Sequence, residues 1–511
     1  MSAIEGREDI AALARGGRTN FFGFLIRLAA RLPFLFIAGR LYGAEVLGRF
    51  AYAVLVVEFA AQIATLGLKR GLAQQLSTTD KPHACVVMDA LLVAFLASAI
   101  ATVALMLFPR AMFPNSPING LEWLLPLIVF AVAGSDVSLA ALAYRHNVGA
   151  TVTARAIVEP WTLSIAAFGW AFISTRDGLI IAYVISMTAA LAASLLPFFR
   201  SYGFPEGWRP EPGTLWRLAR RNTPLAAADA IEWGSRRLDI AILGLFFAPY
   251  YVGVYYVAQQ VASLPQKLKT SFDPILGPVI TQRLAEGDKK AVARQVRQVG
   301  FWIIAAQGGV ALALGIPGEA VMGLVGPNFV GGTGALGFLL AAEVVAATAV
   351  VSEAALVYVA RHRNLMISLI SIGAQAVLSI ILIVTIRGLG FPYPYQAAGP
   401  AVALMLALGL SSVLKARLLS GILGAPVQGW RWPLIWAAAA ATLIGWLFTL
   451  LPRSHEWAEL AFGIPSILIV FGAVVWKRGF TSDDRELFRT RKGDAIEPTL
   501  PPPTGAVESG G

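Results

Sequence analysis

Long apolar stretches recur along the whole 511-residue chain and constrain its fold more than any other feature. In lipid the backbone must satisfy its own hydrogen bonds, and a helix needs about 20 apolar residues to cross the hydrocarbon core. Charged residues make up only 14% of the chain, against about 25% in soluble domains. We therefore predict an all-α polytopic membrane protein with about fourteen transmembrane helices, at residues 17–40, 46–68, 86–108, 121–143, 156–175, 178–199, 219–246, 250–276, 298–317, 334–360, 364–386, 396–420, 432–451 and 457–476.

Positive residues alternate in number from one predicted loop to the next. Of the 41 Lys and Arg residues, 31 lie in the amino-terminal segment, in every second loop or in the tail, and 6 lie in the alternate loops. Cytoplasmic loops carry an excess of Lys and Arg. The asymmetry therefore predicts an even number of spans with both termini in the cytoplasm, a parity that twelve spans would also satisfy.

A segment rich in Pro, Gly and Arg separates the sixth and seventh predicted spans and indicates a linker between two six-helix lobes. The charged tail ends in PTLPPPTGAVESGG, a composition that is typical of disorder. The predicted organisation is a cytoplasmic N-terminus (1–16), an N-lobe (17–199), a cytoplasmic linker (200–218), a C-lobe (219–420), two further spans (421–476) and a disordered cytoplasmic tail (477–511).

An internal repeat relates the two predicted lobes at an offset of 205 residues, which corresponds to six spans. Both copies contain the end of a first helix, a short outer turn and the start of a second helix, in the same direction across the membrane. The repeat is therefore parallel, with its pseudo-two-fold axis along the membrane normal. The matched positions are Arg31 and Arg236, Gly39 and Gly244, Gly48 and Gly253, Phe50 and Tyr255, and Ala53 and Ala258.

Two stretches of the chain resemble the signatures of a known family. Residues 39–77 (GRLYGAEVLGRFAYAVLVVEFAAQIATLGLKRGLAQQLS) are similar to the opening signature of Wzx-type polysaccharide flippases, which serve O-antigen and exopolysaccharide assembly. Residues 238–290 resemble the stretch that opens the carboxyl lobe of those proteins. The resemblance covers roughly residues 17–476 and indicates the multidrug/oligosaccharidyl-lipid/polysaccharide (MOP) exporter superfamily. It implies two six-helix lobes that form a V around a central cavity, followed by two extra helices.

The resemblance also implies an activity. A flippase of this type transfers undecaprenyl-pyrophosphate-linked oligosaccharide from the inner to the outer leaflet of the bacterial cytoplasmic membrane by alternating access. Its expected partners are the lipid-linked oligosaccharide and membrane lipids, with a polysaccharide polymerase and an initiating glycosyltransferase as further candidates. No cofactor and no nucleic acid are implied.

Arginines inside the predicted spans are the candidate substrate-binding residues. Arg27 and Arg31 share one face of the first span with Asn20, and Arg236 takes the position equivalent to Arg31 in the repeat. A guanidinium stays charged when desolvated and can bind a phosphate with two hydrogen bonds. Flippases of the superfamily use cavity arginines in their first helices, which the resemblance carries onto these positions. The structural alternative is that Arg236 only neutralises a nearby carboxylate.

Carboxylates inside the predicted spans are candidates for ion coupling, because ionisable groups in a membrane are costly and mark function by default. Each of them has a structural alternative, as one half of a buried ion pair. The candidates are Asp229, Glu232, Asp239, Glu58, Asp136 and Glu343, with Glu353 as a further acid on the span of Glu343.

Other functions fit the sequence less well. We expect no enzyme, because the chain lacks a phosphate-binding Gly-rich loop or a Ser/His/Asp arrangement. We expect no metal site, because the four histidines lie far apart and Cys85 is the only cysteine. Within the superfamily, the alternatives are a peptidoglycan-precursor (lipid II) flippase and a cation or drug antiporter. The two arginines of the first span favour an anionic substrate over a cation.

Overall fold

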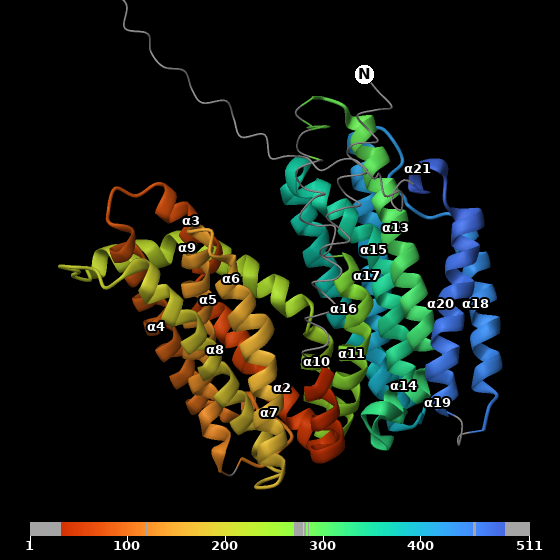
Figure 1. Ribbon diagram of the computed structural model, residues 1–511, viewed down its shortest axis with the longest axis horizontal. Coiled ribbons are helices and arrows are strands. Elements are labelled where there is room, and N and C mark those ends of the chain that lie inside the picture. Colours follow the sequence, from red (N-terminus) through yellow and green to blue (C-terminus); the bar gives the residue numbers. More distant parts are fainter. Residues whose placement is uncertain are drawn as a thin grey trace, which may run out of the picture.

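The fold consists of helices joined by turns throughout the part of the chain that the computed structural model describes (Figure 1). That part comprises residues 32–118, 120–269, 280, 283–284, 286–452 and 456–485. No strand occurs in these residues. The prediction of an all-α polytopic membrane protein is confirmed.

The first bundle begins with helical residues 32–37, the end of the predicted first span. Most helices that follow lie close to the predicted spans as apolar runs that end at Gly, Pro or polar residues, although the helix at Leu68–Ser77 is polar and lies in a predicted loop. They are η1 (Ala38–Tyr42), α2 (Gly43–Ala64), α3 (Leu68–Ser77), α4 (His83–Leu107), η2 (Pro109–Ala111), η3 (Leu121–Leu127), α5 (Ile128–Tyr144), α6 (Val148–Thr151), η4 (Val152–Val158), α7 (Glu159–Ala171) and α8 (Gly178–Tyr202).

The second bundle follows, and two further transmembrane helices flank it. Its elements are α9 (Pro212–Ser235), α10 (Leu238–Phe246), α11 (Pro249–Lys269), α13 (Lys289–Gly315), α14 (Gly318–Val325), η5 (Pro327–Gly332), α15 (Thr333–Val359), α16 (Arg361–Gly388) and α17 (Tyr393–Leu423). The remaining elements are α18 (Pro433–Thr449), α19 (Glu456–Ala458), η7 (Glu459–Gly463), α20 (Ile464–Val474), η8 (Val475–Gly479) and α21 (Ser482–Arg485).

Nine helical stretches in the described residues are long and apolar enough to cross a membrane, and α18 is apolar but shorter. The predicted span at 219–246 needs correction, because α9 ends at Ser235 and α10 starts at Leu238. Arg236 and Arg237 lie in the break. The predicted linker at 200–218 is also too long, because α8 continues to Tyr202 and α9 begins at Pro212.

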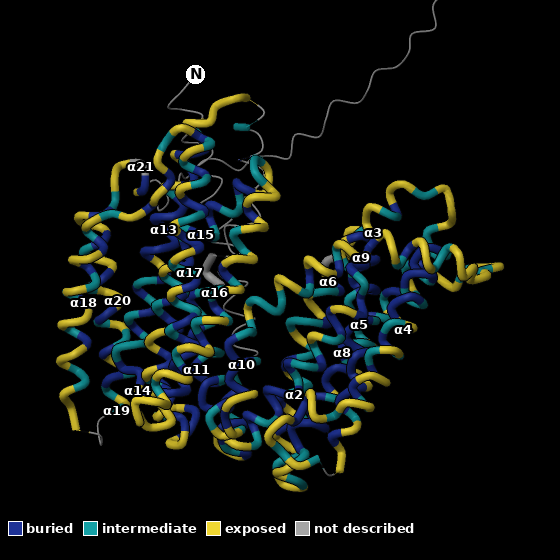
Figure 2. Tube along the Cα trace, turned by 180° about the vertical axis from the view of Figure 1, so that it is seen from behind, coloured by how far each residue is buried: buried dark blue, intermediate teal, exposed yellow. Residues whose placement is uncertain are grey.

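The two bundles form a V in both ribbon views, converging where α2 meets α10 and α11 and diverging toward the ends of α3 and α13 (Figures 1 and 2). One hydrophobic core crosses the convergence, with buried Leu47 and Ala53 on α2 and Val257 and Ala258 on α11. Buried residues otherwise concentrate inside each bundle (Figure 2). The helix cores of the two lobes therefore meet at one end.

Paired glycines make the contact between the lobes. A Cβ atom on Gly48 of α2 would overlap the carbonyl oxygen of Pro249, and one on Gly253 of α11 would overlap the carbonyl oxygen of Ala44. Gly48 and Gly253 are equivalent in the predicted repeat. The two helices therefore meet backbone to backbone around the pseudo-two-fold axis, as small residues allow in membranes.

Helix α9 packs on the N-lobe along most of its length, from Leu218 to Trp233, although it follows the linker in sequence. The side chain of Asn222 fills the space that a Cβ on Gly71 would need, and Gly67 lies against the backbone of Asn222 and Ala226. Gly67 has φ +69°, a conformation that favours glycine. The second lobe is thus tethered to the first by α9 as well as by the contact between α2 and α11.

A carboxylate near the carboxyl end fastens the last helices to the C-lobe. Asp484 accepts hydrogen bonds from Arg431 Nη1 at 2.5 Å, from Trp302 Nε1 at 2.9 Å and from Thr481 Oγ1 at 2.7 Å. The Arg431 guanidinium also lies over the ring of Phe301, 3.8 Å from its centroid. The prediction of disorder from residue 477 is therefore too broad, because residues 477–485 are folded. The partners on α13 and in the α17–α18 loop are far away in sequence, so composition alone did not reveal them.

The glycine contact predicts a stability defect. We expect Gly253→Ala to destabilise the protein by about 1–3 kcal/mol, the usual effect of overpacking, because the new methyl group would overlap the Ala44 backbone. Gly373→Ala on α16 is the control, since a Cβ there has no neighbour within 4 Å. The midpoint of thermal unfolding in detergent measures both. Equal midpoints for the two variants would contradict the backbone contact.

The tail carboxylate predicts a pH-dependent contribution to stability. Burial alone would raise the pKa of Asp484, but hydrogen bonds from Arg431 and Thr481 lower its pKa below the usual 3.8. A carboxyl group whose pKa is lower in the folded than in the unfolded state stabilises the folded state at pH values above the unfolded-state pKa. This stabilisation is lost as the pH falls through the folded-state pKa.

We therefore expect Asp484→Asn to lower the thermal midpoint at pH 6, and we expect its difference from the wild type to shrink as the pH is lowered from 6 to 3. Asp80→Asn, at an exposed position after α3, is the control. A midpoint difference between Asp484→Asn and the wild type that is the same at both pH values would contradict this role for the carboxylate.

Candidate functional site

The predicted substrate-binding residues of the first span, Asn20, Arg27 and Arg31, lie outside the described residues. Their role stays a prediction. Arg236, their counterpart in the second lobe, is described and lies at the break between α9 and α10.

The break exposes two arginines between α9, which packs on the N-lobe, and α10, which packs mainly on helices of the C-lobe. Gly234 and Ser235 end α9, Arg237 has a non-helical φ of −128°, and α10 resumes at Leu238. The Arg236 side chain is 54% exposed and bonds Glu232 Oε1 through Nη2 at 3.1 Å. The Arg237 guanidinium lies 5.4 Å from the ring centroid of Trp233. A guanidinium has five N–H donors, so Arg236 retains donors beyond its bond to Glu232.

Carboxylates on α9 pair with basic residues of α3. Asp229 is buried and lies 2.8 Å from Arg70 Nε and 3.8 Å from Lys69 Nζ. Glu232 is half exposed and lies 2.6 Å from Arg70 Nη2, in addition to its bond with Arg236. The cluster thus spans the N-lobe and the start of the C-lobe. Arg236 therefore does neutralise one nearby carboxylate, that of Glu232, as the structural alternative expects. The carboxylate of Asp229 is paired mainly with Arg70 instead.

Asp239 has a different environment, although it follows the break by only two residues. It is fully buried on α10 and accepts hydrogen bonds from Tyr255 Oη at 2.8 Å and from Gln259 Nε2 at 3.0 Å. Both partners belong to α11. Asp239 therefore joins α10 to α11 within the C-lobe and lies apart from the cluster of Asp229 and Glu232.

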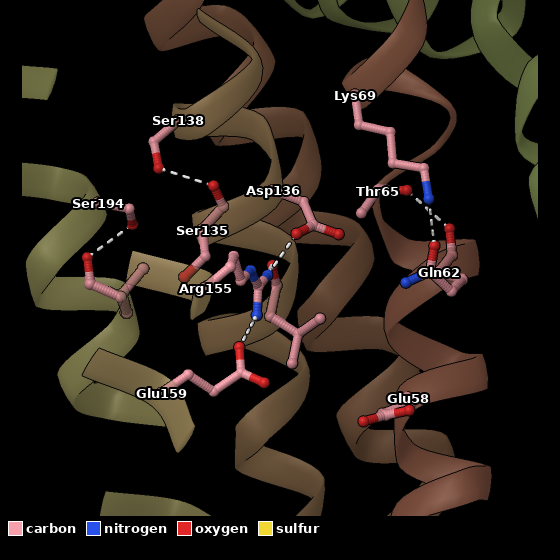
Figure 3. A network of polar contacts seen from close by, with 12 residues as sticks. Glu58, Gln62, Thr65, Lys69, Ser135, Asp136, Ser138, Arg155, Glu159 and Ser194 are labelled. Carbon is pink, nitrogen blue, oxygen red and sulfur yellow. Dashed lines mark hydrogen bonds and ion pairs between the residues drawn. The ribbon is translucent and has the colours of Figure 1, made fainter. Parts of the chain in front are cut away.

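A polar network inside the N-lobe holds two more predicted acids (Figure 3). Arg155 lies between Asp136 of α5 and Glu159 of α7, with an ion pair to each carboxylate; the bond to Glu159 is 3.0 Å long. Arg155 belongs to the π-helical stretch η4, a distortion that is frequent at functional sites. Glu58 of α2 accepts a hydrogen bond from Tyr183 Oη of α8 at 2.8 Å. The network links α2, α5, α7 and α8.

The C-lobe contains its own buried charge. Lys415 of α17 is almost fully buried and lies 2.9 Å from Glu353 Oε2 of α15. Glu343, ten residues earlier on α15, is partly buried. Among the described residues, no group of three or more His, Cys, Asp or Glu side chains is arranged to hold a metal ion.

Sequence reasoning counted several of these basic residues only as loop charges and missed their partners. Lys69, Arg70, Arg155 and Lys415 all contact acids that were considered as candidates for ion coupling. One signal was available, because Arg155 and Glu159 are four residues apart on a helix. The pairs between α3 and α9 and between α15 and α17 join distant segments, which a single sequence does not reveal.

Solved structures with the same two-lobed arrangement define the class of fold. The lipid II flippase MurJ, in an inward closed conformation, matches with a TM-score of 0.67 at 11% identity, over 89% of this chain and 98% of MurJ. A multidrug resistance MATE family transporter in an inward-facing conformation matches with a TM-score of 0.59 at 11% identity, over 78% of this chain and 98% of the transporter. A MOP superfamily transporter from Pyrococcus furiosus matches with a TM-score of 0.54 at 12% identity, over 82% and 96% of the two chains. The chain therefore has the MOP-superfamily fold.

The family follows from a second comparison. A family model described as polysaccharide biosynthesis protein matches residues 37–304, which is more than half of the chain. The chain belongs to this polysaccharide biosynthesis family. A comparison with curated proteins finds no match.

The N-lobe network predicts a large effect of removing its cation. Arg155 is 25% exposed, so Arg155→Met leaves two shielded carboxylates without a counter-charge. We expect a loss of about 3 kcal/mol, at the low end for breaking a buried pair, read from thermal unfolding. The triple variant Arg155→Met, Asp136→Asn, Glu159→Gln should recover most of the loss. If the triple variant is no more stable than Arg155→Met, charge pairing is not what Arg155 contributes.

Proposed function

We propose that the protein flips undecaprenyl-pyrophosphate-linked oligosaccharide units from the inner to the outer leaflet of a bacterial cytoplasmic membrane, for assembly of a surface polysaccharide. The observation that carries the proposal is the break between α9 and α10, which leaves the guanidinium of Arg236 half exposed where the chain passes from the helix packed on the N-lobe to the C-lobe. A cation in this position can bind the pyrophosphate of a lipid carrier. The polysaccharide biosynthesis family and the fold shared with the lipid II flippase MurJ support the same function.

The charge balance around Arg236 favours an anionic ligand. The neighbouring acids are already paired, Asp229 with Arg70 and Glu232 with Arg70 and Arg236. An exposed pair such as Arg236 with Glu232 contributes only about 0–1 kcal/mol. A phosphate can therefore replace Glu232 at low cost. In the proposal Arg27, Arg31 and Asn20 of the first span contribute from the opposite lobe.

The arrangement of the lobes fits one stage of alternating access. The bundles diverge at the end that bears α3 and the start of α13, where the predicted loops hold most of the Lys and Arg residues (Figure 1). By the positive-inside rule this end faces the cytoplasm. The proposed state is inward-facing, with both termini in the cytoplasm. In this state the protein would collect substrate made by an initiating glycosyltransferase, and in an outward-facing state it would release the substrate toward a polymerase.

Ion coupling is assigned in the proposal to acids that can exchange a partner. Glu58 depends on the single hydrogen bond from Tyr183 among the described contacts, so its protonation would not break an ion pair. Asp136 is held by Arg155, and Asp239 by Tyr255 and Gln259, which favours structural roles for both. Asp229 and Glu232 remain candidates only for a step that separates α9 from α3 of the N-lobe, and Glu343 remains a candidate within the C-lobe.

The proposal predicts a transport defect when Arg236 is removed. A charge-assisted hydrogen bond contributes about 1.5–3 kcal/mol, so Arg236→Ala should slow flipping about 10- to 100-fold and Arg236→Lys less. The readout is surface glycan and outward-facing lipid-linked oligosaccharide in a strain that lacks its own flippase, at equal membrane abundance. Arg363→Ala, an exposed arginine at the start of α16, is the control.

A double variant separates binding from charge neutralisation. If Arg236 serves only to satisfy Glu232, then Glu232→Gln with Arg236→Ala restores transport, and the binding role is refuted. If the double variant stays defective, the guanidinium acts on the substrate. The same strains carry a substrate test, since complementation of a MurJ-depleted strain would indicate lipid II instead, and acquired drug resistance would indicate a cation exporter.

A further inference from the structure

A cluster of tyrosines at the closed end of the C-lobe takes no part in the proposed phosphate site. It comes from two turns with related sequences, APYY at 248–251 before and into α11 and FPYPY at 391–395 before and into α17. The rings of Tyr251 and Tyr393 stack at 5.5 Å, and Tyr250 meets Tyr251 edge to face at 5.3 Å. Phe391 and Tyr395 are 6.2 Å apart. Two turns that are distant in sequence thus form one aromatic surface.

The cluster is rigid and open to ligands. Prolines at 249, 392 and 394 restrict both turns, and Tyr250 Oη donates to the carbonyl of Asn328 at 2.9 Å. Tyr393 is 55% exposed, and Tyr395 and Phe391 are also exposed. A pocket of about 60 Å³ opens beside them, lined by Tyr250, Tyr251 and Pro394 among others. At roughly 10–15 Å³ for one water-sized group, it admits a small substituent such as a hydroxymethyl or acetamido group.

We propose that this tyrosine shelf, formed by Tyr250, Tyr251, Tyr393 and Tyr395, binds the glycan of the transported molecule on its outward side. The inference rests on the proposed function, which supplies an oligosaccharide as cargo. A sugar ring presents C–H groups with partial positive charge to the negative face of an aromatic ring. Phenol hydroxyls both donate and accept hydrogen bonds, as sugar hydroxyls require.

The position of the shelf suits this role. Tyr250 and Tyr251 begin α11, the helix that meets α2 at the lobe junction (Figure 1). The loop between α10 and α11 carries no Lys or Arg, as expected of an outer loop. Arg387 adds a donor next to the rings, with its guanidinium 5.7 Å from the centroid of Phe247. A glycan that passes the junction would meet the shelf first.

The competing explanation is a membrane-interface belt, where Tyr and Trp gather in any membrane protein. A belt surrounds the protein at both interfaces, and its residues need no shared pocket. Tyr358, at the carboxyl end of α15, offers a matched control, since it is 54% exposed and lies at the opposite end of the C-lobe. A belt function predicts equal effects at Tyr358 and Tyr393.

The direct test uses the purified full-length protein in nanodiscs. The probe is the oligosaccharide repeat released from the surface polysaccharide of the source strain, without lipid or pyrophosphate, observed by saturation-transfer difference NMR. We expect transfer to the sugar ring protons in the wild type, at least a fivefold loss in Tyr393→Ala and Tyr395→Ala, partial retention in Tyr393→Phe, and no loss in Tyr358→Ala. Transfer that is unchanged in Tyr393→Ala and Tyr395→Ala, or reduced equally in Tyr358→Ala, overturns the shelf.

The export assay separates failure of the shelf from failure of the proposed function. If the wild type restores surface glycan and both shelf variants do so fully at equal abundance, the shelf is wrong and the flippase function stands. If the wild type restores no glycan and its nanodisc sample shows no saturation transfer to the oligosaccharide, the proposed function is wrong, and the shelf proposal, which rests on it, is wrong as well. Reduced export in Tyr393→Ala but not in Tyr358→Ala supports the shelf.

Discussion

The backbone contact between α2 and α11 is the constraint on which the rest of the structure depends. Inside a membrane, lipid tails are as apolar as leucine side chains, so helices associate by close packing rather than by escaping water. Gly48 and Gly253 provide that packing, because each leaves room for the backbone of the other helix. The two glycines are equivalent in the repeat, so the contact lies near the pseudo-two-fold axis. A joint on such an axis can hold both lobes while leaving their far ends separate.

Buried charge is the second constraint, and the structure resolves it by pairing. Arg155 pairs with two carboxylates and Lys415 pairs with Glu353, and these contacts join helices within a lobe. The pair between Asp229 and Arg70 joins α9 to the N-lobe. Arg236 differs, because its single pair is half exposed and lies at a helix break. Arg70 and Lys415 each pair with or contribute a side chain that is nearly fully buried, whereas Arg236 and its partner Glu232 are both about half exposed, so Arg236 remains accessible to a ligand.

The sequence predicted the helices well and their interactions poorly. Hydropathy locates a helix because the membrane imposes its length, and from residue 46 onward a helix or helix pair occupies each predicted span in the described residues. It does not detect the break at Arg236, because apolar residues continue on both sides. The repeat identified Gly48 and Gly253 by position, whereas their contact needed the fold. Ion pairs such as Arg70 with Asp229 depend on how α9 crosses α3, and no local pattern encodes that crossing.

The two ends of the molecule differ in chemistry in the way that an amphiphilic cargo would require. Cations gather where the lobes diverge, and aromatic rings with few charges gather where they meet. Under the proposed function, a pyrophosphate bound near Arg236 places the attached glycan within the V, since the break lies between α9 on the N-lobe and α10 on the C-lobe (Figure 1). When the lobe junction opens, the glycan, which is the uncharged end of the cargo, has a shorter path to the outer side of the membrane than the pyrophosphate has. A tyrosine surface there can hold sugars without competing for the phosphate, because aromatic faces attract C–H groups and repel anions. The separation of cationic and aromatic surfaces would thus let the charged and uncharged ends of the cargo bind at different points of the transport path, which one uniform binding site could not do.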